Sequence, residues 1–157
     1  MTPSVRLVPM SADQFVVYRE AAEQAYAEDI ARSGMMPELE APEKAAEDFS
    51  RLLPNGLGTK DQHFWTALDG DDEVGMVWLA LTEKSDGLHA FGYDLLVPVD
   101  LRRRGYGRAI LVAAEELCRE SGVVRVGLSV FGANAGAQAL YEAMGFEVTM
   151  LQMTKRL

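Results

Sequence analysis

Seven residues between Arg102 and Arg108, in the order Arg-Arg-Arg-Gly-Tyr-Gly-Arg, have the composition of a phosphate-binding loop. Glycines let backbone N–H groups approach a bound anion without obstruction by side chains. Four arginines add full positive charges, and the start of a helix after the loop adds a partial one. The chain therefore carries a candidate phosphate site, although its net charge at pH 7 is −9.

Two regular elements are expected to position this loop. A strand-like run, Phe91 to Val97, precedes it, and a helical pattern extending to about Ser121 follows it. The apolar residues of that helix recur on one face: Ile110, Leu111, Ala114, Leu117 and Cys118. The single cysteine is therefore expected to be a buried thiol and has no partner for an internal disulfide.

The remaining pattern predicts a β-α-α-β-β-β-α-β-α-β order, which is an α/β fold with a mixed sheet. The expected strands are 5–9, 63–68, 74–81, 124–130 and 146–157, and the expected helices are 12–31, 42–53 and one after Asn134. Ser11 or Asp13 can cap the first helix. The acidic residues 69–73 form a hairpin turn, and residues 84–87 form a second one.

Composition restricts the class of protein. A chain of 157 residues is expected to form a single domain, residues 1–157. We expect no membrane association, because no run approaches the roughly 20 apolar residues of a spanning helix. We also expect no metal, since Cys118, His63 and His89 lack metal-site spacing. The acidic net charge argues against binding to nucleic acid. A cytoplasmic protein is expected.

Charge is unevenly distributed along the chain. Residues 1–48 hold ten acidic and four basic side chains, a net charge of −6, whereas residues 101–108 hold four arginines and no acid. The acidic part either keeps the protein soluble or attracts a cation. The arginine loop favours a polyanion.

Two common phosphate sites do not fit the loop. A dinucleotide-binding Gly-x-Gly-x-x-Gly/Ala pattern needs a third small residue where this chain has Ile110. A P-loop needs Gly-Lys-Ser/Thr, which is absent. The sequence instead fits Arg/Gln-x-x-Gly-x-Gly/Ala, from Arg102 to Gly107.

A second motif makes the pattern specific. Asn134 to Phe146 follows Asn-x-x-Ala-x-x-Leu-Tyr-x-x-x-Gly-Phe, one strand after the loop. Together the two motifs resemble the acyl-CoA-dependent N-acyltransferase (GNAT) superfamily, and Met153 to Leu157 resembles its closing strand. The resemblance covers about Leu88 to Leu157. It implies a mostly antiparallel sheet with a central V-shaped splay, flanked by about four helices.

The resemblance also implies a site for acetyl-CoA as co-substrate. A pantetheine arm is expected to pair with the backbone of Leu95, Leu96 and Val97, and a diphosphate with the loop. Asn134 matches a cofactor-contacting asparagine, or acts only as a helix cap. The loop residues implied in cofactor binding are Arg102, Arg103, Arg104, Gly105, Tyr106, Gly107 and Arg108.

Acyl transfer from a thioester to an amine needs a donor for the departing thiolate. Tyr141 matches the tyrosine that acts as general acid in such enzymes, and a phenol with a pKa near 10 is protonated at neutral pH. The N–H of Val97 is a candidate oxyanion donor. Where some relatives carry a basic glutamate, this chain has Ser129. Asp94 is therefore a candidate base, together with carboxylates of the first helix: Glu20, Glu23, Glu28 and Asp29.

The acidic N-terminal half predicts a cationic acceptor, namely an amine of a small molecule, a polyamine or a peptide. The alternative is an acyl-CoA-binding sensor without turnover, which the serine at position 129 favours and Tyr141 disfavours. A homodimer is a further expectation from the resemblance.

Overall fold

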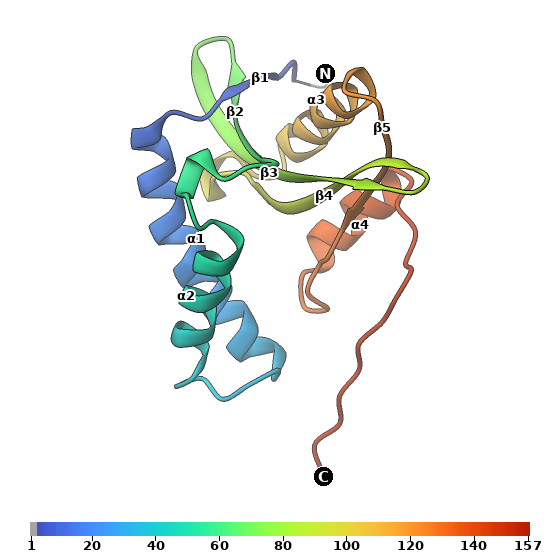
Figure 1. The fold of residues 1–157 in the computed structure, drawn as a ribbon. Coiled ribbons are helices and arrows are strands. Elements are labelled where there is room, and N and C mark those ends of the chain that lie inside the picture. The colour runs from blue at the N-terminus through green and yellow to red at the C-terminus, as the bar shows by residue number, and fades with distance from the viewer. Residues whose placement is uncertain (1–2) are drawn as a thin grey trace. The chain divides into compact units, whose positions relative to one another are not determined.

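Five strands form one sheet in the computed structural model, which describes residues 3–157. The strands follow their order in the sequence across the sheet (Figure 1): β1 Arg6–Pro9, β2 Gln62–Asp69, β3 Asp72–Lys84, β4 Gly87–Leu96 and β5 Val123–Leu128. The first four are antiparallel to their neighbours, and β5 is parallel to β4. The predicted mixed, mostly antiparallel sheet is confirmed.

Within residues 3–157, four α-helices accompany the sheet, as expected. They are α1 Ala12–Ser33, α2 Ala41–Leu52, α3 Tyr106–Glu120 and α4 Ala135–Ala143, with short 3₁₀ turns η1 Gly56–Gly58 and η2 Val99–Leu101. The α1 helix begins with a capping box, since Gln14 N donates to Ser11 Oγ and Ser11 N donates to Gln14 Oε1. Of the two predicted caps, Ser11 is the one used.

The chain divides into two compact units, which we describe separately. The sheet unit contains the residues up to Val16 together with Leu53–Ser129, and the helical unit contains Val17–Leu52 and Val130–Leu157. The sheet unit therefore holds all five strands and α3. The helical unit holds most of α1, together with α2, α4 and the C-terminal segment.

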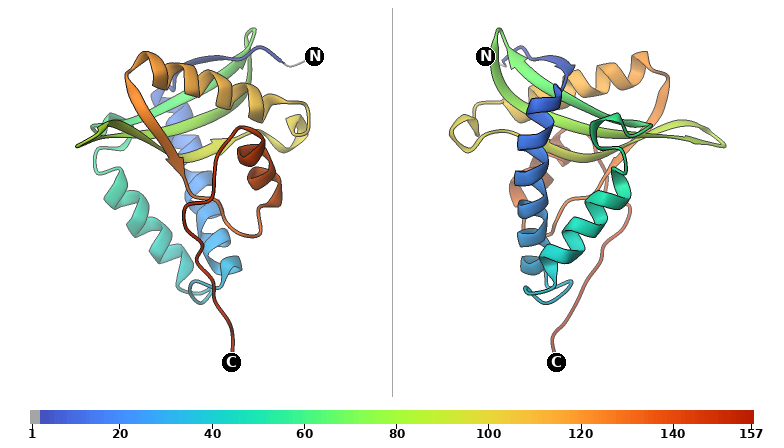
Figure 2. Two further views of the ribbon diagram at one scale, coloured as in Figure 1. Left: turned by 90° about the vertical axis from the view of Figure 1, so that its right-hand side faces the viewer. Right: turned by 60° about the vertical axis from the view of Figure 1, so that its left-hand side comes forward.

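The core of the sheet unit lies between α3 and one face of the sheet (Figure 2). Ile110 of α3 is completely buried and packs with Val77 and Leu79 of β3. Cys118 belongs to the same cluster, and burial raises the pKa of its thiol. This agrees with the predicted buried cysteine and gives α3 a fixed position behind the loop at its start.

The predicted strand from Phe146 to Leu157 is wrong. The chain forms no regular secondary structure after α4, and Figure 2 shows this segment as an extended trace. From Val148 onward its apolar side chains face solvent; Met150, for example, is 82% exposed. The alternation of side chains is typical of a strand, but a strand also needs a neighbouring backbone, which the pattern does not reveal.

The phase of β5 also differs from the prediction. In the expected strand 124–130 apolar residues alternate with others from Val124 on, but Val124 is exposed, and Val123 packs against the core cluster instead. The register changes at this point, since Leu88 pairs with Val123 and His89 pairs with Arg125. Val124 is the extra residue of a bulge, and strict alternation cannot predict a bulge.

Candidate active site

The strand before the arginine loop has one partly unpaired edge. On one side, β4 pairs with β3 as far as Leu96, opposite Met76. On the other side, pairing with β5 ends at Gly92 and Leu128. Within the described residues, no strand continues this ladder alongside Tyr93–Leu96. Open N–H and C=O groups at such an edge accept an added extended chain. The predicted pantetheine positions Leu95 and Leu96 lie here, and Val97 follows directly.

A bulge lies where this edge opens. Trp78 of β3 pairs with Asp94 and Leu79 pairs with Gly92, so Tyr93 is the extra residue. A bulge bends its strand and increases the local twist. Residues that pair across a ladder project from the same face of a sheet, so Asp94, the candidate base, shares a face with Trp78.

The loop that follows has the backbone of an anion cradle. Arg103 has a φ of 63° and Gly105 has a φ of 89°, so two residues close together adopt left-handed conformations. A Cβ on Gly105 would lie 3.1 Å from Pro3 Cδ, so a larger residue there would also crowd Pro3. Successive turns of this kind point backbone N–H groups in one direction, toward the space before α3.

Two side chains of the loop hold its shape. Arg102 Nε donates to Val97 O at 3.0 Å, and Tyr106 Oη donates to Asp69 Oδ2 at 2.9 Å. The hydrogen bond to Asp69 raises the pKa of the Tyr106 phenol. Both residues were predicted to contact the cofactor. In the structure their side chains join the loop to the end of β4 and to the end of β2, which leaves that prediction untested.

The other three arginines of the loop remain available to an anion. Arg103, Arg104 and Arg108 are exposed, and none of them pairs with a carboxylate within residues 3–157. Unneutralised guanidinium groups beside a helix N-terminus attract phosphate oxygens. The sheet unit therefore brings together the loop amides, three arginines and the open edge of β4.

The remaining predicted residues lie in the helical unit. Asn134 caps α4, because its Oδ1 accepts a hydrogen bond from Ala137 N at 3.1 Å. Tyr141 is half-buried on α4, and its ring centre lies 5.6 Å from that of Phe146 in an edge-to-face arrangement. Ala137, Leu140 and Met144 are also half-buried, so these apolar side chains share the partly covered side of α4 with Tyr141.

Most of the candidate carboxylates on α1 have partners on the same helix. Glu23 pairs with Arg19 at 3.9 Å and Asp29 with Arg32 at 3.0 Å, while Glu28 accepts from Gln24 Nε2 at 3.3 Å. Glu20 is exposed. Such pairs are typical of a solvated helix face.

No pattern in the sequence predicts the charged cluster between α1 and α2. Asp48 is 6% exposed and accepts from Tyr26 Oη at 3.0 Å and Arg51 NH2 at 2.9 Å, and also from Lys44 Nζ. Burial alone raises the pKa of Asp48, but these hydrogen bonds together outweigh it and lower the pKa. Burial and Asp48 raise the pKa of Tyr26 to about 12. The cluster joins the two helices.

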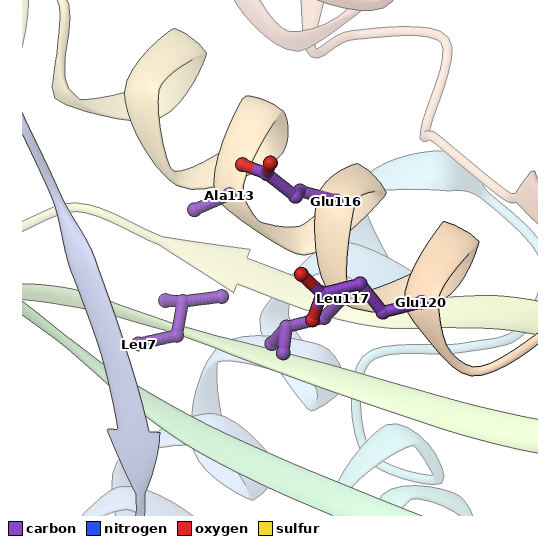
Figure 3. Close-up of a pocket in the computed structure, with 5 residues that line it drawn as sticks. All are labelled: Leu7, Ala113, Glu116, Leu117 and Glu120. Carbon is purple, nitrogen blue, oxygen red and sulfur yellow. The ribbon is translucent and has the colours of Figure 1, made fainter.

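A shallow hollow between β1 and α3 does not suit the cofactor. Figure 3 shows Leu7 and Leu117 at the hollow, with the carboxylates of Glu116 and Glu120 beside them. Two carboxylates four residues apart on a helix repel a diphosphate. Residues 3–157 contain no cluster of three or more His, Cys, Asp or Glu side chains arranged to hold a metal ion. None of their helices is both long and apolar enough to cross a membrane.

Comparisons with known proteins agree on one family. Residues 21–146 match the model of the acetyltransferase (GNAT) family. Two proteins of Bacillus subtilis (strain 168), both called uncharacterized N-acetyltransferases, are similar over nearly their whole length. YycN is 32% identical over 98% of this chain and 99% of its own, and YdgE is 30% identical over 96% and 97%.

Solved structures give the same result. The crystal structure of the putative acetyltransferase YycN from Bacillus subtilis has a TM-score of 0.94, at 32% identity and with 98% of this chain and 99% of that chain covered. The aminoglycoside N-acetyltransferase AAC(6')-Iy, solved in complex with CoA, shares the fold with a TM-score of 0.62 at 15% identity, over 100% and 97% of the two chains. The family match and the full-length relatives show that this chain belongs to the GNAT family of acetyltransferases.

Proposed function

We propose that this chain, as a single domain over residues 1–157, moves an acetyl group from acetyl-CoA to a primary amine of a cationic small molecule, polyamine or peptide. One observation carries the proposal: the open edge of β4 runs directly into a loop with exposed arginines and left-handed backbone turns. An extended thiol arm and a diphosphate are the two chemical parts of CoA that these features suit.

The donor is bound by the sheet unit in this proposal. The backbone of Leu95, Leu96 and Val97 pairs with the pantetheine arm, and the amides from Arg103 to Arg108 hold the diphosphate. The side chains of Arg103, Arg104 and Arg108 meet its oxygens or the 3′-phosphate. The hydrogen bond from Arg102 to Val97 O supports this assignment, because it fixes the residue whose N–H we assign to the oxyanion. Asn134 adds an amide contact besides its capping bond.

Acetyl transfer then proceeds by direct attack. The lone pair of a neutral amine forms a bond to the thioester carbonyl carbon, and the N–H of Val97 stabilises the negative oxygen. The carbon–sulfur bond breaks as the tetrahedral intermediate collapses. Tyr141 gives its phenolic proton to the departing CoA sulfur and regains one from solvent. Asp94 removes the proton of the amine, directly or through water.

The charge distribution supports a cationic acceptor. The net charge of −9, with −6 in residues 1–48, attracts protonated amines and disfavours anions. We therefore expect a higher kcat/KM for amines that carry a second positive charge than for acidic amines of similar size.

A thiol-release assay with a panel of amines tests this function. Acetyl-CoA is incubated with mono-, di- and polyamines, short peptides and acidic or hydroxyl acceptors, and free CoA is measured. The expected result is turnover with cationic amines and its loss in Tyr141→Phe. Stabilisation of the fold by acetyl-CoA without turnover on any amine would instead identify an acyl-CoA sensor. A preference for acidic or hydroxyl acceptors would contradict the electrostatic argument.

We also propose that the protein is a cytoplasmic homodimer. The exposed apolar side chains after α4, such as Met150 and Met153, support the dimer, because a second copy can cover them. The single buried cysteine, Cys118, suits a reducing compartment. Light scattering is expected to give twice the chain mass, falling to one chain mass when both methionines are replaced by glutamate.

A further inference from the structure

A row of aromatic rings crosses the sheet and ends at the bulge of β4. Phe64 of β2 stacks on Trp78 of β3 with ring centres 4.9 Å apart, and Trp78 stacks on Tyr93 of β4 at 4.7 Å. The interplanar angles are 27° and 29°, so the three rings are nearly parallel. Phe64 and Trp78 are almost completely buried, whereas Tyr93 is 39% exposed.

By its place in the stack, the outer face of the Tyr93 ring is directed toward the edge of β4 that no longer pairs with β5. The stack runs from β2 through β3 to β4, so the next place in the row is beside β4. The ladder between β4 and β5 stops one residue before Tyr93, at Gly92. Phe91 occupies the edge of the Tyr93 ring rather than the end of the stack, because it lies two residues along the same strand, with ring centres 4.8 Å apart at 65°.

The bulge also brings a carboxylate to this ring. In a regular strand Tyr93 and Asp94 would point to opposite faces of the sheet. Here Asp94 pairs with Trp78, while Tyr93 is unpaired and stacks on the same Trp78. An aromatic ring and an acid therefore share one face, next to the β4 residues Leu95 and Leu96, which carry the open edge.

We propose that Tyr93 and Asp94 form the head-group site of the acceptor, in which an ammonium group lies against the ring of Tyr93 and close to Asp94. A cation within about 6 Å of an aromatic centre is attracted by the negative ring face, more strongly where water is excluded. The proposal rests on the proposed function and narrows its substrate class. The ring faces of Tyr93 and Phe91 favour ammonium groups on alkyl or arylalkyl bodies, and polyhydroxylated amines lose hydration there.

A probe that cannot be acetylated tests this site without turnover. Benzyltrimethylammonium has no N–H, and neopentylbenzene is its neutral counterpart of nearly the same shape. Binding of both is measured by NMR titration of the CoA-bound protein. The proposal predicts binding of the cation, an upfield ring-current shift of its N-methyl protons, and at least about tenfold weaker binding of the neutral compound.

Two substitutions at position 93 distinguish the contribution of the aromatic ring to cation binding from that of side-chain size. Tyr93→Phe keeps the aromatic face and is expected to bind the cation within about twofold of the unaltered protein. Tyr93→Leu removes the face and is expected to weaken binding by about tenfold. Asp94→Asn is expected to weaken binding and to reduce its dependence on ionic strength. Thermal unfolding checks that each variant is folded.

Two results would overturn the proposal: equal binding of the cation by the Tyr93→Phe and Tyr93→Leu proteins, or equal binding of the cationic and neutral probes. The ring-current shift decides the matter even if Tyr93→Leu does not fold. These outcomes are distinct from failure of the proposed enzyme, which is the absence of CoA release with every amine.

Discussion

The sheet unit and the helical unit differ in what holds them together. The sheet unit has a dry core in which Ile110 is fully buried against β3, and its loop is fixed by hydrogen bonds from Arg102 and Tyr106. The helical unit has a smaller apolar cluster, which includes Ile30 and Ala45, and adds the charged cluster around Asp48; it ends in an exposed apolar segment. A rigid apolar framework suits recognition of a constant ligand such as CoA. Individual polar side chains suit recognition of an acceptor, which differs from one enzyme to another.

The largest expected effect is on kcat, when the hydroxyl oxygen of Tyr141 is removed from the helical unit. If Tyr141 protonates the leaving thiolate, Tyr141→Phe lowers kcat by about a hundredfold or more and leaves the KM for acetyl-CoA within about twofold. Steady-state kinetics with a preferred amine measure both. The control, Tyr26→Phe, removes a phenolic hydroxyl from the same unit and is expected to keep kcat within about threefold. An equal loss in both variants would assign the effect to packing.

The close packing of the sheet unit is tested at Gly75. A Cβ there would clash with the backbone oxygen of Leu96 and would lie 2.7 Å from Ile110 Cδ1, so Gly75→Ala forces β3 away from the end of β4 and displaces the Ile110 side chain. We expect a loss of about 2–3 kcal/mol in the free energy of unfolding, measured with urea. Gly136→Ala on α4 meets no atom within 4 Å and is expected to be neutral or stabilising. Equal losses of unfolding free energy for the two substitutions would contradict the close packing assigned to the sheet unit at Gly75.

The charged cluster of the helical unit is tested at Asp48. Asp48→Ala leaves Lys44, Arg51 and the Tyr26 phenol without their common acceptor. Because Lys44 and Arg51 are partly exposed and stay hydrated, we expect a cost of about 2 kcal/mol in urea unfolding. The matched control is Glu115→Ala, which breaks an i,i+4 pair with the exposed Arg119 and is expected to cost less than about 1 kcal/mol. Equal costs would mean that burial of Asp48 does not matter.

The pH dependence of stability gives the smallest expected effect. The pKa of Tyr26 is raised from 10.0 to about 12 in the folded protein, so the unfolded chain loses this proton first. The stabilisation from Tyr26 is complete below pH 10 and is lost as the pH rises to 12. The stability difference between the unaltered protein and Tyr26→Phe is therefore expected to shrink by about 1–2 kcal/mol over this interval. A constant difference would contradict the assigned hydrogen bond.

Prediction from sequence succeeded where a signal is local. The loop from Arg102 to Arg108, the hairpin between β2 and β3, and the cap at Asn134 depend on residues close together in the chain. The strand expected after Phe146 failed because strand formation needs a partner, which periodicity does not specify. The bulges at Tyr93 and Val124 were missed for a related reason, since each depends on the register with a neighbouring strand.

The candidate site was predictable to the same extent. The two motifs singled out Tyr141 and the loop, but they did not show that Tyr106 donates to Asp69, 37 residues away. They also did not join Tyr26 to Asp48, which are 22 residues apart. Contacts of this kind depend on how elements pack. For the same reason, the placement of Tyr93 and Asp94 on one face of the sheet could be recognised only from the structure.

Calorimetric titration with CoA tests most directly whether the arginine loop of the sheet unit binds the donor. The double variant Arg104→Gln, Arg108→Gln is compared with Arg119→Gln, Arg125→Gln, which removes the same charge from other parts of the sheet unit. The loop variant is expected to bind CoA at least about tenfold more weakly and with less dependence on salt, while the control binds as the unaltered protein does. Equal weakening in both variants would show that net charge, and not this loop, holds the diphosphate.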